Sequence, residues 1–163
     1  TELKQKDYLL DRMMSALEKS PVGIALLDNT GNYYYMNKSH AEILEYESGD
    51  LIGKHWKTIY EESEATLIEK EYFPMLLKNG SWKGITYGIT KNKKPIRQEI
   101  SLTTFDDGGL LCITRDVGAV IEELEEVQKT KHQLELAMRA SNLGRWTYHI
   151  DTGVLDLNET IGK

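Results

Sequence analysis

The segment from Pro21 to Asn37, PVGIALLDNTGNYYYMN, constrains the fold more than any other part of this chain. An apolar run of strand length, residues 23–27, leads into the turn Asp28-Asn29-Thr30-Gly31. There Asp and Asn can bond their own backbone, and Gly accepts a positive φ. An aromatic run, residues 33–36, suits a pleated surface. Asn37 or Ser39 can then cap a helix. The predicted order is strand, tight turn, strand and helix.

Composition limits what this hairpin belongs to. The 163 residues suffice for one domain with a good core and something extra. Apolar residues make up 40% and charged residues 28%, which is typical of soluble globular proteins. The net charge of −6 argues against nucleic acid or an anionic membrane as a direct partner. The single cysteine, Cys112, excludes an intrachain disulfide and a thiolate metal cluster.

The chain has no signal peptide and no apolar run near the roughly 20 residues of a membrane span. A cytoplasmic protein without membrane contact is therefore expected. The first residue is Thr rather than Met, so we expect a fragment or a processed product.

Helices are predicted on both sides of the hairpin. Residues 1–20 have apolar side chains at helical spacing, and Pro21 ends that helix. It either covers one face of a sheet or forms a dimer, and both alternatives stay open. A short helix follows over residues 38–46. The longest helix spans residues 63–78, with Ser63 as its cap and a kink or early break at Pro74. Its apolar face should contain Leu67, Ile68, Tyr72, Met75 and Leu76.

Three strands are predicted over residues 81–90, 95–105 and 110–114. The second alternates between polar and apolar residues, whereas the third is continuously apolar, as in a central strand buried on both faces. Turns this short force antiparallel neighbours. The order of two strands, helices and three strands predicts an α+β domain with one five-stranded antiparallel sheet and helices on one face.

A set of short motifs runs through the segment from about Ser20 to Val117. It consists of Asp28, Gly31, Asn37, Leu51-Ile52-Gly53, Gly80-Ser81-Trp82-Lys83-Gly84 and Arg115-Asp116-Val117-Gly118. Each motif alone is weak, but in this order and spacing the set resembles a PAS domain. The departure is Gly118, where the family often has Thr.

Residues 118–140 are predicted to form a linker helix with a heptad stripe. Its core positions are Val117, Val120, Leu124, Val127, Lys131, Leu134 and Met138. Glutamates crowd the other faces, so a parallel coiled coil is favoured over an amphipathic helix lying on a sheet face.

The end of the chain repeats its beginning. Ser141-Asn142-Leu143-Gly144 mirrors the start of the first hairpin, and Asp151-Thr152-Gly153 mirrors its turn. Residues 141–163 therefore resemble the truncated start of a second PAS domain. The predicted organisation is a flanking helix (1–19), a PAS domain (20–117), a linker helix (118–140) and this partial domain (141–163).

Alternation predicts a pocket between the sheet and the helices. The side chains expected to face it are those of Ala25, Leu27, Gln98, Ile100, Leu102, Cys112 and Thr114. Gly84 and Gly88 should leave room beside the third strand, and polar groups among apolar walls suit a small ligand. The favoured alternative is a filled core, closed by Trp56, Tyr60 and Phe73, because large aromatic rings occupy much of a cavity.

The sequence requires no cofactor and does not identify one. The four histidines do not pair at helical spacing, so no metal site is expected. Haem-binding PAS relatives usually place a histidine on the long connector helix, and residues 63–78 contain none. Photoactive relatives carry a reactive cysteine where this chain has Trp56, so no covalent flavin adduct is expected. Cys112 is expected to be an inert core residue.

The resemblance implies a sensory and signal-relay module of a larger signalling protein, most often a sensor histidine kinase of a two-component system. A small ligand or partner would alter the sheet, and Asp116, Val117 and Gly118 would pass that change to the linker helix. Alternatives are a ligand-free dimerisation spacer, or a PAS module of a diguanylate cyclase or a transcriptional regulator. The sequence shows no nucleophile–base pair or phosphate loop, so this segment is not expected to be an enzyme. The expected partners are a second copy, as a homodimer, and neighbouring domains of the same chain.

Overall fold

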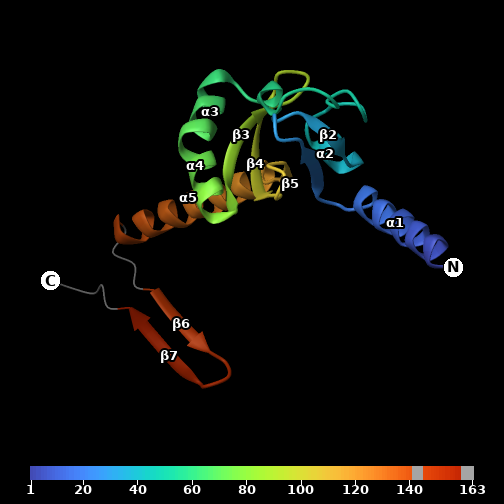
Figure 1. Ribbon diagram of the computed structural model, residues 1–163. Helices are drawn as coiled ribbons and strands as arrows, with labels where there is room; N and C mark the ends of the chain where they lie inside the picture. The colour runs from blue at the N-terminus through green and yellow to red at the C-terminus, as the bar shows by residue number, and fades with distance from the viewer. Residues whose placement is uncertain (141–144, 159–163) are drawn as a thin grey trace. The chain divides into compact units, whose positions relative to one another are not determined.

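The computed structural model describes residues 1–140 and 145–158 (Figure 1). The chain divides into two compact units between Gly118 and Ala119, and each is described by itself. Within the described ranges, no helix has the length and apolar character needed to cross a membrane.

The first unit is built on one antiparallel sheet. Its strands lie in the order β2-β1-β5-β4-β3. Their bounds are β1 (Gly23–Leu27), β2 (Tyr33–Met36), β3 (Ser81–Ile89), β4 (Pro95–Thr104) and β5 (Leu110–Asp116). The register sets Ala25 opposite both Met36 of β2 and Cys112 of β5. The predicted α+β fold with a five-stranded antiparallel sheet and flanking helices is confirmed.

The turn between β1 and β2 is held by Asp28, as its residue type predicts. One carboxylate oxygen, Oδ1, accepts hydrogen bonds from the Thr30 amide (2.9 Å), the Thr30 hydroxyl (2.7 Å) and the Asn32 amide (3.0 Å). Gly31 has φ +83°, which glycine adopts without steric cost. A register shift between Leu26 and Leu27 then places Tyr33 opposite Leu27, so the Tyr33 ring enters the core.

Helix α2 (Lys38–Ile43) begins at Asn37, whose side chain accepts a hydrogen bond from the His40 amide. Asn37 is therefore the cap. Ser39, the other candidate, instead donates its hydroxyl hydrogen to the Ser20 carbonyl oxygen (2.6 Å).

The connector predicted as one helix is divided into three parts. These are α3 (Glu62–Leu67), a π-helical turn η2 (Ile68–Tyr72) and α4 (Phe73–Asn79), and they follow a 3-10 turn η1 (Trp56–Ile59). The cap of α3 is Glu61, so the prediction of Ser63 is wrong. The wide turn ends at Tyr72, two residues before Pro74, which has no amide hydrogen to donate to a regular helix.

This irregular turn also changes which connector side chains are buried. Ile68 and Leu76 lie in the core, but Leu67 and Met75 are 40% and 42% exposed. The single apolar face predicted for this segment is therefore only partly right, because a helix that contains a π turn does not keep the regular helical spacing.

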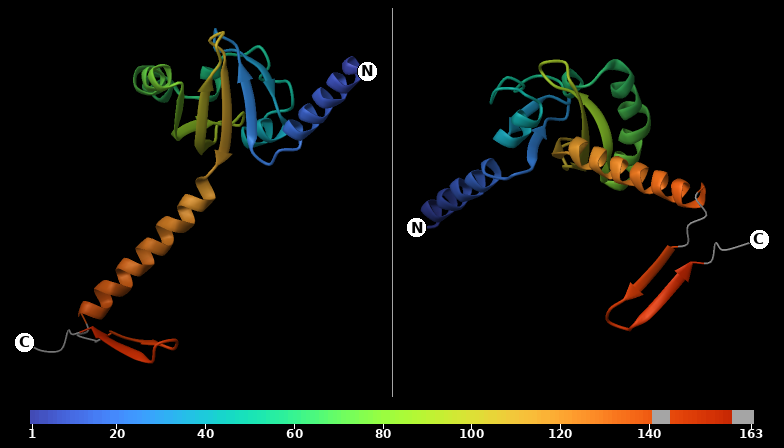
Figure 2. Two further views of the ribbon diagram at one scale, coloured as in Figure 1. Left: turned by 60° about the horizontal axis from the view of Figure 1, so that its bottom comes forward. Right: turned by 180° about the vertical axis from the view of Figure 1, so that it is seen from behind.

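The core lies between one face of the sheet and the connecting helices (Figure 2). Strand β5 is central, as predicted, but the expectation that it is buried on both faces is wrong. Cys112 and Thr114 are buried, whereas Leu111 and Ile113 are only partly covered. The burial of β5 alternates because side chains on successive residues point to opposite faces of the sheet.

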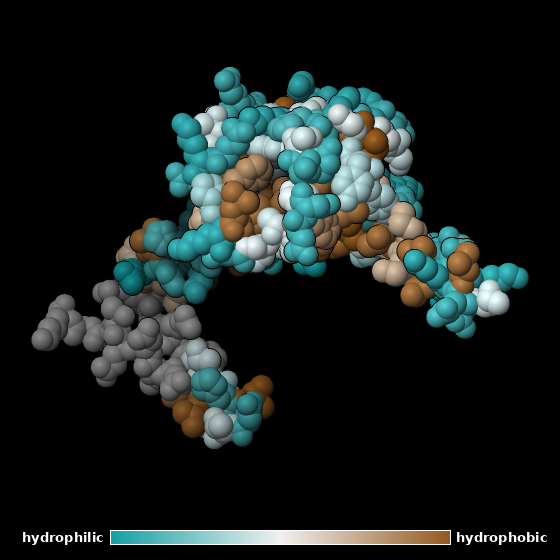
Figure 3. Space-filling model, viewed as in Figure 1, coloured by the Kyte–Doolittle hydropathy of each residue, from teal (hydrophilic) through white to brown (hydrophobic). Residues whose placement is uncertain are grey.

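Helix α1 (Glu2–Glu18) contains no buried residue. Several of its apolar side chains, including Leu3, Leu10 and Met13, are at least half exposed. Figure 3 shows hydrophobic and hydrophilic residues side by side on this helix. The alternative in which this helix covers a sheet face is therefore not found. A role in dimer formation stays a prediction.

Helix α5 (Gly118–Ala140) has no buried residue, and all of it except Gly118 belongs to the second unit, which also contains a two-stranded antiparallel sheet. Strand β6 (Arg145–His149) pairs with β7 (Val154–Asn158). A hairpin is thus present where the sequence repeat predicts one, although the Ser141-Asn142-Leu143-Gly144 motif lies outside the described residues. That this hairpin opens a second domain stays a prediction.

Candidate functional site

The inner face of the sheet carries the side chains that alternation predicts. All seven are buried, and Gln98 and Thr114 are among the most completely buried polar residues of the described chain. The buried set is Ala25, Leu27, Gln98, Ile100, Leu102, Cys112 and Thr114. Their burial is confirmed, whereas a role in ligand binding stays a prediction.

The cavity inside this core is small, about 30 Å³. Trp56 closes it by packing edge-on against Tyr60 and Phe73, at 5.8 Å and 5.2 Å between ring centroids. A space of this size holds about one water molecule, so the core is filled, as the favoured alternative predicts. The lining residues are Leu27, Tyr33, Trp56, Tyr60, Ile68, Phe73, Ile100, Leu102, Leu110 and Cys112.

Three of these lining residues, Tyr33, Ile68 and Leu110, are not among the predicted pocket candidates. Tyr33 enters because of the register shift in the first hairpin, for which the sequence carries no clear signal. Four candidates, Ala25, Gly88, Gln98 and Thr114, are not in the cavity wall.

Both glycines predicted to leave room beside β3 are covered by side chains of this chain. The Trp82 ring lies over Gly84, where an added Cβ would be 2.5 Å from a ring carbon. The Gln98 amide lies directly over Gly88. The space that the glycines provide is therefore used by Trp82 and Gln98, and the expectation of open room is wrong.

The buried end of β3 and β4 is polar. The Tyr60 hydroxyl lies 3.1 Å from the Thr86 hydroxyl. Beside them, Gln98 is fully buried, and neither its amide oxygen nor its amide nitrogen has a hydrogen-bond partner among the described residues. A buried polar group without a partner costs roughly 1–3 kcal/mol. The Gln98 amide therefore keeps one donor and one acceptor atom that no described residue satisfies.

The titratable groups around the cavity stay uncharged. Burial raises the pKa of the Cys112 thiol to about 11, so its thiolate is scarce at neutral pH. Burial likewise raises the pKa values of the Tyr33 and Tyr60 hydroxyls. A neutral, mostly apolar interior disfavours a charged occupant. In the described part of the chain, no group of three or more His, Cys, Asp or Glu side chains is placed to hold a metal ion.

The predicted relay residues lie at the end of β5. Asp116 accepts a hydrogen bond from the Gly118 amide at Oδ1 (2.9 Å), and the Val117 amide donates to the Arg97 carbonyl oxygen of β4 (3.0 Å). In the strand register, Asp116 lies opposite Gln98. Gly118, the first residue of α5, is therefore bonded to the end of β5, and the residue before it is bonded to β4.

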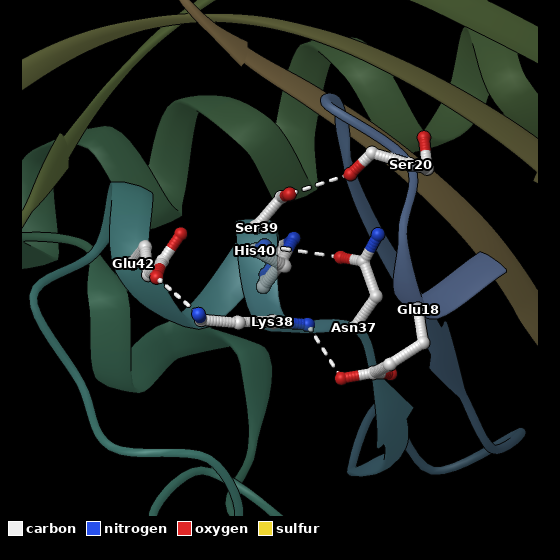
Figure 4. Close-up of polar contacts among 7 residues, drawn as sticks. All are labelled: Glu18, Ser20, Asn37, Lys38, Ser39, His40 and Glu42. Carbon is white, nitrogen blue, oxygen red and sulfur yellow. Dashed lines mark hydrogen bonds and ion pairs between the residues drawn. The ribbon is translucent and has the colours of Figure 1, made fainter. Parts of the chain in front are cut away.

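A second junction, which sequence reasoning missed, is centred on Asn37 (Figure 4). This side chain is fully buried and makes four hydrogen bonds, of which Figure 4 draws the one with His40. Its Oδ1 accepts from the amides of Ile24 (2.8 Å) and His40 (3.0 Å), while its Nδ2 donates to the carbonyl oxygens of Leu17 (2.8 Å) and Val22 (2.9 Å). One amide group thus joins the end of α1, the start of β1 and the first turn of α2. Two features of the sequence pointed to Asn37: it was a candidate helix cap, and it was one of the residues that match the family motifs.

Further contacts surround Asn37. The Glu18 carboxylate accepts hydrogen bonds from the Lys38 amide (3.2 Å) and the Tyr35 hydroxyl (3.3 Å), as Figure 4 shows for Lys38. The neighbouring His40 is buried, and neither ring nitrogen has a partner among the described residues. Burial lowers the pKa of His40 to about 4, so its ring is neutral at neutral pH.

Comparison with known proteins agrees with this arrangement. The family model described as the PAS domain matches residues 21–119. No curated protein matches the chain.

Solved structures share the fold at low sequence identity. One is the PAS domain of a LuxR-family transcriptional regulator from Burkholderia thailandensis in complex with ethanol (TM-score 0.60, 17% identity, 64% of this chain and 96% of that chain). Another is the PAS domain of a protein from Colwellia psychrerythraea (0.61, 19%, 66% and 96%). A third is a domain of a sensory box sensor histidine kinase/response regulator from Geobacter sulfurreducens (0.57, 17%, 67% and 95%). These similarities support the fold alone.

Proposed function

Because this chain belongs to the PAS domain family, we propose that it is a sensory and signal-relay module of a larger signalling protein. One observation carries the proposal: both helices that flank the sheet are hydrogen-bonded to it at its ends. Asn37 holds the end of α1, and Asp116 holds the start of α5. A change in the sheet that alters these contacts would shift the helices between two states.

We propose that the signal is a small uncharged molecule, or a partner that acts on the same interior. The neutral walls of the cavity support this choice. The Gln98 amide, which is buried outside those walls, adds a donor and an acceptor without partners to the same interior. The Burkholderia structure holds ethanol in a PAS domain of related fold, which is an occupant of this chemical class. Because the cavity is about 30 Å³, a ligand larger than a few atoms would require Trp56 or Phe73 to move.

We further propose that the parent is a sensor histidine kinase and that the module acts as a homodimer through α1 and α5. The first part is supported by the Geobacter neighbour, which is a domain of a sensor histidine kinase/response regulator. The exposed apolar residues of both helices support self-association. A transcriptional regulator is the alternative parent, as in the Burkholderia protein.

A second candidate function is a ligand-free dimerisation spacer. The filled core favours it, because a spacer needs no cavity. The two functions differ in whether the sheet must transmit a change. A spacer requires only that the flanking helices associate.

The proposal is tested by the output activity of the full-length parent carrying Asp116→Ala. The substitution removes the bond to the Gly118 amide, so we expect output that no longer follows the signal while the protein stays folded. Glu71→Ala, an exposed change on η2, is the matched control and should leave output unchanged. Normal signalling in the Asp116→Ala protein would favour the spacer instead.

A further inference from the structure

A cleft on the surface of the first unit is distinct from the interior cavity. It lies where the β1–β2 turn, the β4–β5 turn and α4 come together, and its volume is about 420 Å³. Small-molecule sites typically span roughly 300–1,000 Å³. The cleft therefore has the size of a binding site, which the interior lacks.

The chemistry of the cleft is acidic and aromatic. Its wall contains the carboxylates of Asp28, Glu69 and Asp106, and none of the described residues that line it is Lys or Arg. Hydrogen bonds within the β1–β2 turn, first of all from the Thr30 hydroxyl, lower the pKa of Asp28, so this group is ionised at neutral pH. Phe105 is also part of the wall and is 41% exposed. Negative charge beside exposed aromatic surface is complementary to an organic cation.

An ammonium group of the protein itself already uses this chemistry. The Lys57 Nζ lies 2.5 Å from a Glu69 carboxylate oxygen and 5.7 Å from the centroid of the Trp56 ring. Glu69 and Trp56 both line the cleft. The side chains of the ion pair are 44% and 45% exposed, and a surface pair of this kind opens readily. A ligand ammonium that enters from the cleft can therefore replace the one from Lys57.

We propose that this cleft binds a small organic cation with an apolar body. Its ammonium takes the position of the Lys57 Nζ between Glu69 and Trp56, and its apolar body lies against Phe73 and Phe105. This site is separate from the proposed interior site, but Trp56 and Phe73 line both. An occupant of the cleft thus contacts the aromatic wall of the core directly.

The probe for the test is phenethylammonium, which joins an ammonium to an aromatic body, and binding is measured by isothermal titration calorimetry. We expect binding to weaken about fivefold or more in Glu69→Gln, which loses the carboxylate, and to strengthen about threefold in Lys57→Met, which removes the competing ammonium. The matched control pair is Lys83→Met and Glu99→Gln. Those residues form an ion pair of similar type at 3.1 Å on β3 and β4, and both controls should bind as the original chain does.

Two further ligands separate charge from shape. Ethylammonium has the charge without the aromatic body, and 2-phenylethanol has the body without the charge; both should bind more weakly than phenethylammonium. Equal binding of 2-phenylethanol would overturn the proposal, because the cleft would then be an apolar groove without cation selectivity. It would also be overturned by no binding of phenethylammonium to either the original chain or Lys57→Met at millimolar concentration, or by equal weakening in Glu99→Gln and Glu69→Gln.

Discussion

At the scale of single residues, Asn37 and His40 are both buried and lie within one helical turn of each other, but their hydrogen bonding differs. Asn37 satisfies all of its hydrogen-bonding groups, whereas neither ring nitrogen of His40 has a partner in the described part of the chain. Asn37 therefore fixes the geometry of the junction, and His40 makes the stability of the fold depend on pH.

The stability of the fold should fall in mild acid because of His40. Burial lowers its folded-state pKa from 6.5 to about 4, so the unfolded chain binds the proton first as the pH falls. The stabilising contribution of the neutral His40 ring is complete above pH 6.5 and is lost as the pH falls towards 4. We expect the free energy of unfolding to drop by roughly 2 kcal/mol between neutral pH and pH 5, measured by urea denaturation.

The variant His40→Leu keeps a buried side chain but cannot be protonated, so its unfolding free energy should be nearly constant over that pH range. His132→Gln, an exposed change on α5, is the control and should keep the original pH dependence. A slope in His40→Leu equal to that of the original chain would show that another group is responsible.

The two junctions should differ strongly in their effect on stability. Asn37→Ala removes four hydrogen bonds and leaves buried groups unpaired, so it should destabilise the fold by roughly 3 kcal/mol. Asp116→Ala, at an exposed position, should cost about 1 kcal/mol or less. Chemical denaturation of both variants at neutral pH measures the difference. Similar values for the two would contradict the central position given to Asn37.

Residue patterns in the sequence were enough to predict which strand positions face the core, because alternation along a strand is a local property. They did not predict what fills the space. Gly84 and Gly88 look alike in the sequence whether a ligand or a neighbouring side chain covers them. Likewise, the two donor bonds of Asn37 go to carbonyl groups of Leu17 and Val22, which only the fold brings close.

At the scale of elements, the hairpin and the three later strands were predictable, but the connector was not. Pro74 predicted a kink or break in this helix, but the sequence did not predict that a π-helical turn would form before it. As a result, Leu67 and Met75 are exposed rather than buried. Irregular helices depend on tertiary packing, which local periodicity does not record.

The stripe on α5 should mediate self-association. Val120, Leu124 and Val127 are each more than 60% exposed, and an isolated helix of this kind is marginal in water. Leu124→Ser combined with Val127→Ser should abolish the dimer in analytical ultracentrifugation. Leu136→Ser, an exposed apolar position outside the stripe, is the control.

Because the glutamate faces repel each other, added salt should strengthen the dimer. A monomer at every concentration and salt level would rule this dimer out.

At the scale of the whole molecule, the sheet connects the two junctions through neighbouring strands. Ala25 of β1 lies opposite Met36, the residue before Asn37, and also opposite Cys112 in the strand that ends at Asp116. The sequence predicted the C-terminal junction from a family motif. That the N-terminal junction is bonded just as directly follows only from the fold.

The central claim is that a change inside the sheet reaches both junctions, and hydrogen–deuterium exchange measured by NMR tests it directly. The perturbation is Gln98→Leu, which removes the unpartnered buried amide opposite Asp116, and the control is Thr103→Val on the exposed side of the same strand. The account predicts altered exchange at the Gly118 and His40 amides in Gln98→Leu but not in Thr103→Val. A change confined to the residues around position 98 would contradict it.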